Sequence, residues 1–201
     1  EKYEAYEKSL ANNEPEAIYK KAQNYHYGSK GFTKDEAKAV EFYIKAADLG
    51  YLPAMKEYYS IHLDDKAITG ETLARFNRYA IEIVEQEQRD WDIQRLADRY
   101  LAGDRIEENR EKARALYQRA LTLDPSSSAS YDMGYLNRFD NNLPLAKKGN
   151  VEAMLIIARA YGNGNGIREN QEESFKWMEK AAKGGNLDAA FYYGVDLQEG
   201  V

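Results

Sequence analysis

Residues 153–185 read AMLIIARAYGNGNGIRENQEESFKWMEKAAKGG. Ala153, Ile157, Ala158 and Tyr161 recur at helical spacing, which predicts a helix with small and large apolar groups on one face. The glycine-rich run 162–166 then ends this helix, because glycine adopts the positive φ angles that a tight connection requires. A second helix is predicted after the loop, ending at Gly185. The stretch therefore predicts a helix hairpin.

The same frame returns along the chain, which marks an internal repeat. Its copies start at Ala17, Ala54, Asp92, Ala129, Ala153 and Ala189. Successive starts differ by 37, 38, 37, 24 and 36 residues, and the copy at Ala54 fits the frame least well. The short step predicts that the copy starting at Ala129 keeps only a reduced second helix over residues 144–149. The array is therefore expected to bend or tighten near residues 138–145.

Local signals predict where several helices begin and end. Asn13 is expected to cap the helix that contains Glu14, Pro15 and Glu16. Thr33 and Glu36 form a capping-box pattern for the helix that precedes Gly50. Pro125 is expected to close the helix over residues 110–123, because a proline ring cannot continue it.

Composition excludes several classes of function. The chain has 201 residues, a formal charge of −6 and no cysteine, so disulfides and thiolate zinc sites are excluded. A cysteine-free chain suits both the cytoplasm and a bacterial periplasm. No basic stripe suggests a nucleic-acid partner, and no apolar run approaches the roughly 18 residues of a transmembrane helix. Tyrosine is abundant, with 17 residues, which indicates a patterned role in packing and at surfaces.

The two ends of the chain interrupt the repeat. Residues 1–13 are predicted to be the remnant second helix of a preceding copy, and the last copy lacks its second helix. Helical arrays need polar caps over their terminal apolar faces. We therefore expect this sequence to be a piece of a longer protein, or its last face to be covered by a partner, which includes self-association through the uncapped C-terminal repeat.

The repeat pattern resembles a known family. Ala-x3-Leu-Gly-x2-Tyr, a Gly-x-Gly loop, then Trp or Tyr and Ala-Ala-x2-Gly is similar to the Sel1-like repeat, a relative of the tetratricopeptide repeat. The resemblance covers roughly residues 14–201 and is strongest over 153–185. It implies an all-α fold, a right-handed α–α superhelix of helix-turn-helix repeats, forming one solenoid domain over residues 1–201.

The resemblance also implies a binding surface. In the tetratricopeptide architecture the first helix of each pair lines the concave face, and the matching positions here are candidate partner-binding residues. They are Tyr19, Gln23, Tyr27, Lys56, Tyr131, Tyr135, Arg138, Phe139, Arg159 and Phe191, and the third copy adds Gln94, Asp98, Leu101 and Ala102. Aromatic residues and arginine carry most of the energy at interface centres. Tyr131, Tyr135, Arg138 and Phe139, beside the shortened copy, form the strongest candidate cluster.

No catalytic, metal or cofactor site is predicted. His26 and His62 have no ligand partners at metal-binding spacing, and His62 is expected to be packed. The glycine run 162–166 follows no strand and precedes no Gly-Lys-Ser/Thr motif, so a phosphate-binding loop is not indicated.

We therefore expect a non-catalytic scaffold or adaptor that binds another protein or peptide on its concave face. Two alternatives stay open. One is an immunity or inhibitor protein that neutralises a secreted toxin, and the other is an envelope module for polysaccharide export or assembly.

Overall fold

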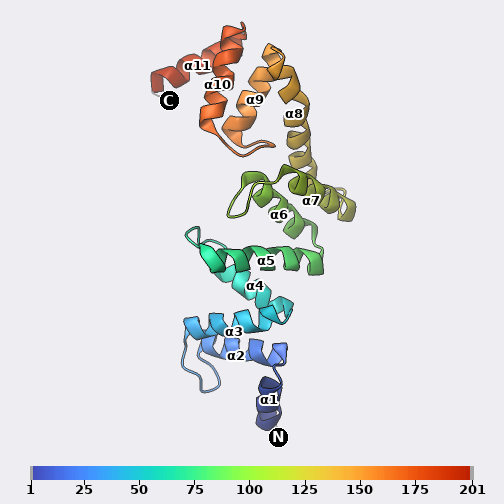
Figure 1. The fold of residues 1–201 in the computed structure, drawn as a ribbon, viewed down its shortest axis with the longest axis vertical. Helices are drawn as coiled ribbons and strands as arrows, with labels where there is room; N and C mark the ends of the chain where they lie inside the picture. Colours follow the sequence, from blue (N-terminus) through green and yellow to red (C-terminus); the bar gives the residue numbers. More distant parts are fainter. Residues whose placement is uncertain (1, 200–201) are drawn as a thin grey trace. The chain divides into compact units, whose positions relative to one another are not determined.

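The computed structural model describes the backbone of residues 2–199 and the side chains of residues 7–194. Within this part of the chain all regular structure is α-helical, in eleven helices, so the all-α class is confirmed (Figure 1). The chain divides into two compact units, Glu1–Gln88 and Arg89–Val201. The joining of both units into one continuous solenoid domain stays a prediction.

Unit 1 contains five helices, of which α2 to α5 form two hairpins. The helices are α1 (Lys2–Ala11), α2 (Pro15–Tyr27), α3 (Glu36–Asp48), α4 (Leu52–Ile61) and α5 (Gly70–Glu87). Helix α1 lies where the remnant second helix is expected, although its first side chains lie outside the described residues.

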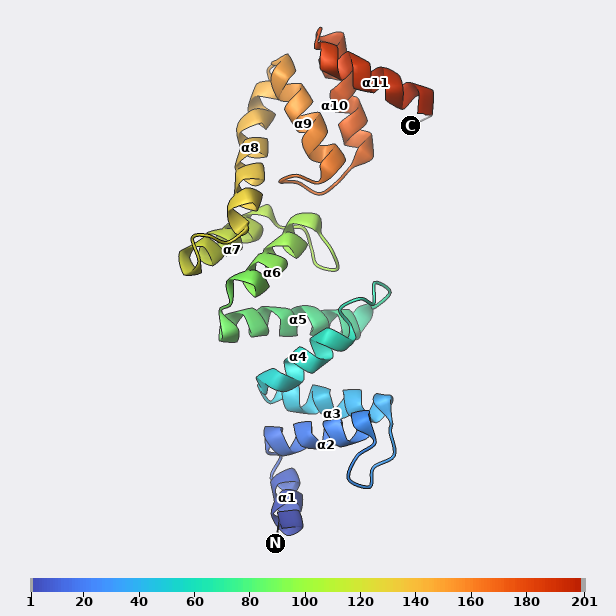
Figure 2. The ribbon, with the colours of Figure 1, turned by 180° about the vertical axis from the view of Figure 1, so that it is seen from behind.

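Unit 2 contains six helices, shown from the opposite side in Figure 2. They are α6 (Asp90–Ala102), α7 (Arg110–Leu123), α8 (Ala129–Lys147), α9 (Val151–Asn163), α10 (Gln171–Lys183) and α11 (Leu187–Glu199). The predicted end at Gly200-Val201 lies outside the described residues.

The helices agree with the phase of the predicted frame. Each predicted start lies in the first turn of a helix, namely α2, α4, α6, α8, α9 and α11. The five alanines among these starts are all buried. Small side chains at these positions let neighbouring helices approach closely, and aromatic side chains fill the spaces between them.

Tyrosine fills much of the core of unit 1. Tyr43, Tyr58 and Tyr79 are almost completely buried, and the rings of Tyr58 and Tyr79 meet at right angles with centroids 5.2 Å apart. The hydroxyl of Tyr79 donates to Asp48 over 2.6 Å, which satisfies the polar end of an otherwise apolar side chain. His62 packs on Tyr58 with ring centroids 4.6 Å apart, and burial lowers its pKa, as expected for a packed histidine.

Two of the predicted helix caps are wrong. Helix α3 is capped by Asp35, whose carboxylate accepts from the backbone N–H of Lys38, so the helix begins two residues after the position that Thr33 predicts. Glu14, not Asn13, precedes α2, with Pro15 at its first position. The end of α7 at Leu123, ahead of Pro125, is confirmed.

The copy that starts at Ala129 also differs from the prediction. Residues 144–147 do not form a separate second helix but continue α8, which keeps Pro144 in its interior. An interior proline removes one backbone hydrogen bond, at a cost of about 3 kcal/mol. Ala146, in the turn that follows Pro144, is buried in the cluster that includes Ala153 and Ile157. The two expected helices of this copy are therefore one.

Within the described residues, no helix is long and apolar enough to cross a lipid bilayer.

Candidate functional site: a groove on the first helices of unit 2

Two adjoining cavities open on unit 2, and together we call them the groove. The first has a volume of about 270 Å³ and is lined by Tyr135, Arg138, Phe139, Ile156, Arg159, Ala160, Asn163 and Asn165. The second, of about 360 Å³, is lined by Asp98, Leu101, Ala102, Tyr117, Asp132, Tyr135 and the loop residues 164–169. Tyr135 and Asn165 line both cavities, so they mark the boundary between the two halves.

The walls of the groove come mainly from first helices of successive copies. Helix α6 supplies Asp98, α8 supplies Tyr135, and α9 supplies Ile156. A hydrogen bond of 2.7 Å from Gln94 to Asp132 ties α6 to α8. Tyr117 of α7 and the loop between α9 and α10 complete the lining.

The loop after α9 is held directly against α8. A Cβ atom on Gly166 would lie only 2.4 Å from the carbonyl oxygen of Tyr135, so this approach requires glycine. Gly166 also has a φ of +76°, a conformation that other L-residues rarely adopt. Its carbonyl accepts from Nη1 of Arg110 over 2.6 Å. Arg110 also pairs with Asp140 of α8, as does Arg114, so Arg110 binds both the loop and the helix.

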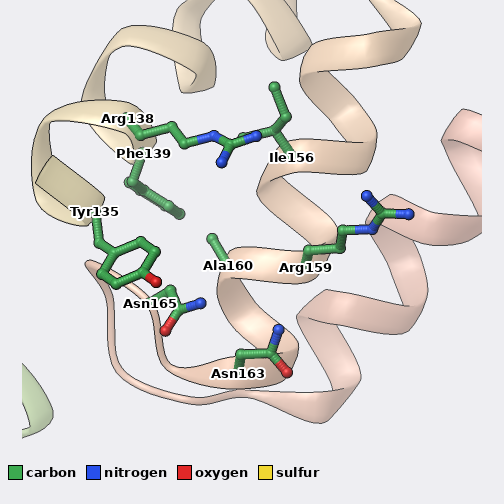
Figure 3. A pocket seen from close by; sticks show the side chains of 8 residues that line it. All are labelled: Tyr135, Arg138, Phe139, Ile156, Arg159, Ala160, Asn163 and Asn165. Atoms are coloured by element: carbon green, nitrogen blue, oxygen red, sulfur yellow. The ribbon is translucent and has the colours of Figure 1, made fainter. Parts of the chain in front are cut away.

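The first cavity presents a cation. Figure 3 shows Arg138 reaching from α8 across the cavity towards Ile156 of α9, whereas Arg159 points away from it. The Arg159 guanidinium lies 3.6 Å from the Asp188 carboxylate and beside the ring of Tyr192, so it is directed towards α11. Arg138 is exposed and is therefore the cation available to a partner.

The second cavity presents two carboxylates. Asp98 accepts a hydrogen bond of 2.6 Å from the buried Tyr117 hydroxyl, and Asp132 accepts from Gln94. Loss of water around the Asp98 carboxylate raises its pKa, and the charge of Asp132 raises it further, whereas Tyr117 and Arg95 act in the opposite direction. Burial likewise raises the pKa of Asp132. Negative charge in this cavity is therefore incompletely compensated by the protein.

The raised pKa values lead to a prediction about pH. The pKa of each of these carboxyls is higher in the folded chain than its ordinary value of 3.8, so between the two pKa values the folded chain binds more protons than the unfolded chain. The free energy of unfolding therefore falls as pH rises from the unfolded pKa to the folded pKa. We expect the Asp98→Asn/Asp132→Asn variant to gain stability over the wild type as pH rises from about 4, with a constant difference at higher pH. Urea unfolding across this pH range measures it, and a difference that shrinks with rising pH contradicts it.

The described residues hold no group of three or more His, Cys, Asp or Glu side chains that could bind a metal ion.

Comparison with known proteins accounts for the repeat. A sequence model of the Sel1 repeat matches residues 15–51, 94–125 and 151–186, more than half of the chain. The chain belongs to the Sel1 repeat family. Sel1 repeats generally act as protein–protein interaction modules, and Sel1 repeat proteins are generally non-catalytic scaffolds. The matched segments contain the predicted copy starts Ala17 and Ala153, and the segment 94–125 begins two residues after the third predicted start, Asp92.

Solved bacterial Sel1 repeat structures resemble the chain at low sequence identity. c5321, a protective antigen present in uropathogenic Escherichia coli strains displaying an SLR fold, is 19% identical with a TM-score of 0.49, over 98% of this chain and 44% of that chain. A Sel1 repeat protein from Oxalobacter formigenes is 21% identical with a TM-score of 0.45, and the match covers 93% of this chain and 84% of that protein. Helicobacter pylori cysteine rich protein B (hcpB) is 20% identical with a TM-score of 0.29, and the match covers 79% of this chain and 95% of that protein. The chain thus spans less than half the length of c5321. A search of curated proteins finds no match.

The Sel1 repeats of unit 2 bring part of the predicted binding cluster together. Tyr135, Arg138 and Arg159 line the groove, as do Asp98, Leu101 and Ala102 of the preceding copy. Tyr131 is 74% exposed but lines neither cavity, and Phe191 is exposed on α11 against Tyr192.

Phe139 corrects the prediction. Its side chain is only 3% exposed, packs edge-on against Tyr161 with centroids 5.4 Å apart, and lies under the guanidinium of Arg110 at 4.7 Å. It lines the first cavity and belongs to a core cluster that includes residues of α8 and α9.

The predicted residues of unit 1 have partners within that unit. The Tyr19 hydroxyl accepts a hydrogen bond from Gln23 over 3.1 Å and donates one to Glu57 over 3.4 Å. Burial, and next the charge of Glu57, raises the pKa of Tyr19 to about 12. Lys56 pairs with Glu87 at 2.8 Å. Tyr27 is exposed beside His26. A role of these residues in binding stays a prediction.

Several groove residues escaped the sequence analysis. Asp132 lies three residues before Tyr135, and helical spacing alone would have placed it on the same face. Asn163 ends α9, and Asn165 and Arg168 lie in the loop that follows, where the repeat pattern indicates only a turn.

Proposed function

We propose that this chain is a non-catalytic scaffold or adaptor that binds a protein or peptide on the first helices of unit 2, in the groove. The observation that supports this proposal most directly is the shared lining of the two cavities by α6, α8 and α9, the first helices of three successive copies. Such a surface offers one partner contacts with several repeats at once.

The groove also has the side chains of an interface centre. Tyr135 is 42% exposed and contributes a rigid ring with a hydroxyl at low conformational cost. Arg138 contributes a planar cation that can form several hydrogen bonds. Phe139 and Ala160 give the first cavity an apolar base, and water is excluded there when a partner covers it.

A double substitution tests the proposal. We expect Tyr135→Ala/Arg138→Ala to abolish partner binding, because it removes the ring and the cation that line the first cavity. Both side chains are solvent-exposed, so the free energy of unfolding should change by no more than about 0.5 kcal/mol. The measurement is quantitative mass spectrometry of proteins retained from a lysate of the source organism, together with urea unfolding.

The matched control is Leu145→Ala/Lys147→Ala, which removes an exposed apolar side chain and a cation from the same helix outside both cavities. The proposal requires a protein that the wild type and the control retain and the groove variant loses. Equal retention by all three chains would reject the groove as the binding surface.

A further inference from the structure

The groove carries opposite charges at its two ends. In the second cavity, the carboxylates of Asp98 and Asp132 accept hydrogen bonds only from neutral groups, and the ion pairs formed by the described residues include neither of them. The loop that closes this cavity adds Arg168 and Glu169, one charge of each sign. The cavity therefore has a net negative charge that comes from α6 and α8.

The opposite end is positive. Arg138 extends over the first cavity in Figure 3, and the ion pairs of the described residues do not include its guanidinium, whereas Arg159 is paired with Asp188. Asn163 and Asn165 beside it add neutral donors and acceptors. A negatively charged group placed there would meet one unpaired cation and amide groups.

Along α8, the two charged positions are separated by the length of a short peptide segment. Asp132 and Arg138 are six residues apart on α8, which is about 9 Å along a helix axis. An extended chain covers about 3.3 Å per residue, so about three residues span this length. Tyr135 lies between the two positions and lines both cavities, where its ring can contact the residues in the middle of such a segment.

We propose that the groove binds an extended segment of a protein partner whose lysine or arginine side chain enters the cavity beside Asp98 and Asp132, while an acidic side chain about three residues away pairs with Arg138. This inference rests on the proposed function and specifies the chemistry of the partner. An apolar segment fits less well, because it would remove water from two carboxylates and a guanidinium without replacing the lost hydrogen bonds.

Selection from a library of random linear peptides tests this charge pattern. The immobilised full chain is compared with Asp98→Asn/Asp132→Asn, which removes two charges at nearly constant shape, and with Arg138→Gln. The wild type should enrich peptides with a basic and an acidic residue about three positions apart. The aspartate variant should lose only the preference for the basic residue, and Arg138→Gln only the preference for the acidic one.

One enriched peptide then measures how much the charged residues contribute to binding affinity. Replacing its basic residue by methionine should weaken binding to the wild type about tenfold and to the aspartate variant hardly at all. The control Leu145→Ala/Lys147→Ala, outside both cavities, should bind like the wild type. Enriched peptides that require Tyr135 but show no charge preference would overturn this inference and leave the proposed function standing. Absence of any enrichment over Tyr135→Ala/Arg138→Ala would also overturn this inference, whereas the proposed function is rejected only by equal retention of proteins by the groove variant, the control and the wild type.

Discussion

Replacing Gly166 by alanine should lower the free energy of unfolding of unit 2 by about 3 kcal/mol. This value adds the cost of placing alanine in a left-handed backbone conformation to the cost of an overpacked contact. The added Cβ would lie 2.4 Å from the Tyr135 carbonyl oxygen and 2.6 Å from the Leu136 nitrogen. Both are backbone atoms of α8, so no flexible side chain can move aside. The loop must therefore shift away from the helix, and the wall shared by the two cavities would shift with it. Urea unfolding measures the loss.

Gly149→Ala separates the two contributions. Gly149 also has a positive φ, +95°, but nothing lies within 4 Å of the position that its Cβ would take. Alanine there should cost only the backbone conformation, about 1–2 kcal/mol. If Gly166→Ala and Gly149→Ala cost the same, the close approach of the loop to α8 does not hold the groove together.

Phe139→Ala should destabilise the chain by about 3–5 kcal/mol, because it removes a buried aromatic side chain and leaves a cavity beside Tyr161. The guanidinium of Arg110 would also lose the ring over which it lies. Thermal and urea unfolding give the value. This prediction follows from the structure and opposes the sequence-based placement of Phe139 on the binding surface.

Tyr131→Ala is the matched control for this substitution. Both residues lie on α8, both were predicted to bind a partner, and only Phe139 is buried. Tyr131 is exposed, so its replacement should change the free energy of unfolding by no more than about 0.5 kcal/mol. Similar losses for the two variants would contradict the assignment of Phe139 to the core.

The repeat frame explains why so much of the fold could be predicted. Ala153, Ile157 and Ala158 are spaced for one buried helix face, and the structure buries all three. This information is local, since helical spacing is fixed by the backbone. The cap at Asp35 was missed because Thr33 offers an equally good local pattern, and only the course of the preceding loop decides between them.

The groove was less accessible to sequence analysis. Tyr135 and Arg138 were found because they occupy exposed positions on a first helix, and Phe139 was misplaced because it packs against Tyr161 and Arg110, which lie far from it in the sequence. The loop after α9 lies against α8 through Gly166 and Arg110, which are distant in sequence from Tyr135. The spacing of residues within α8 therefore cannot predict this contact. Likewise, Pro144 is unfavourable inside a helix by local rules, yet α8 continues through it, and its last turn buries Ala146 in the core.

Amide hydrogen exchange, measured on the free chain and on the chain saturated with a captured partner, tests the central claim most directly. The groove as binding surface predicts slower exchange over residues 132–139 of α8 and in the loop 163–168. Slower exchange confined to the second helices α7 and α10, with α8 and the loop unchanged, would contradict it.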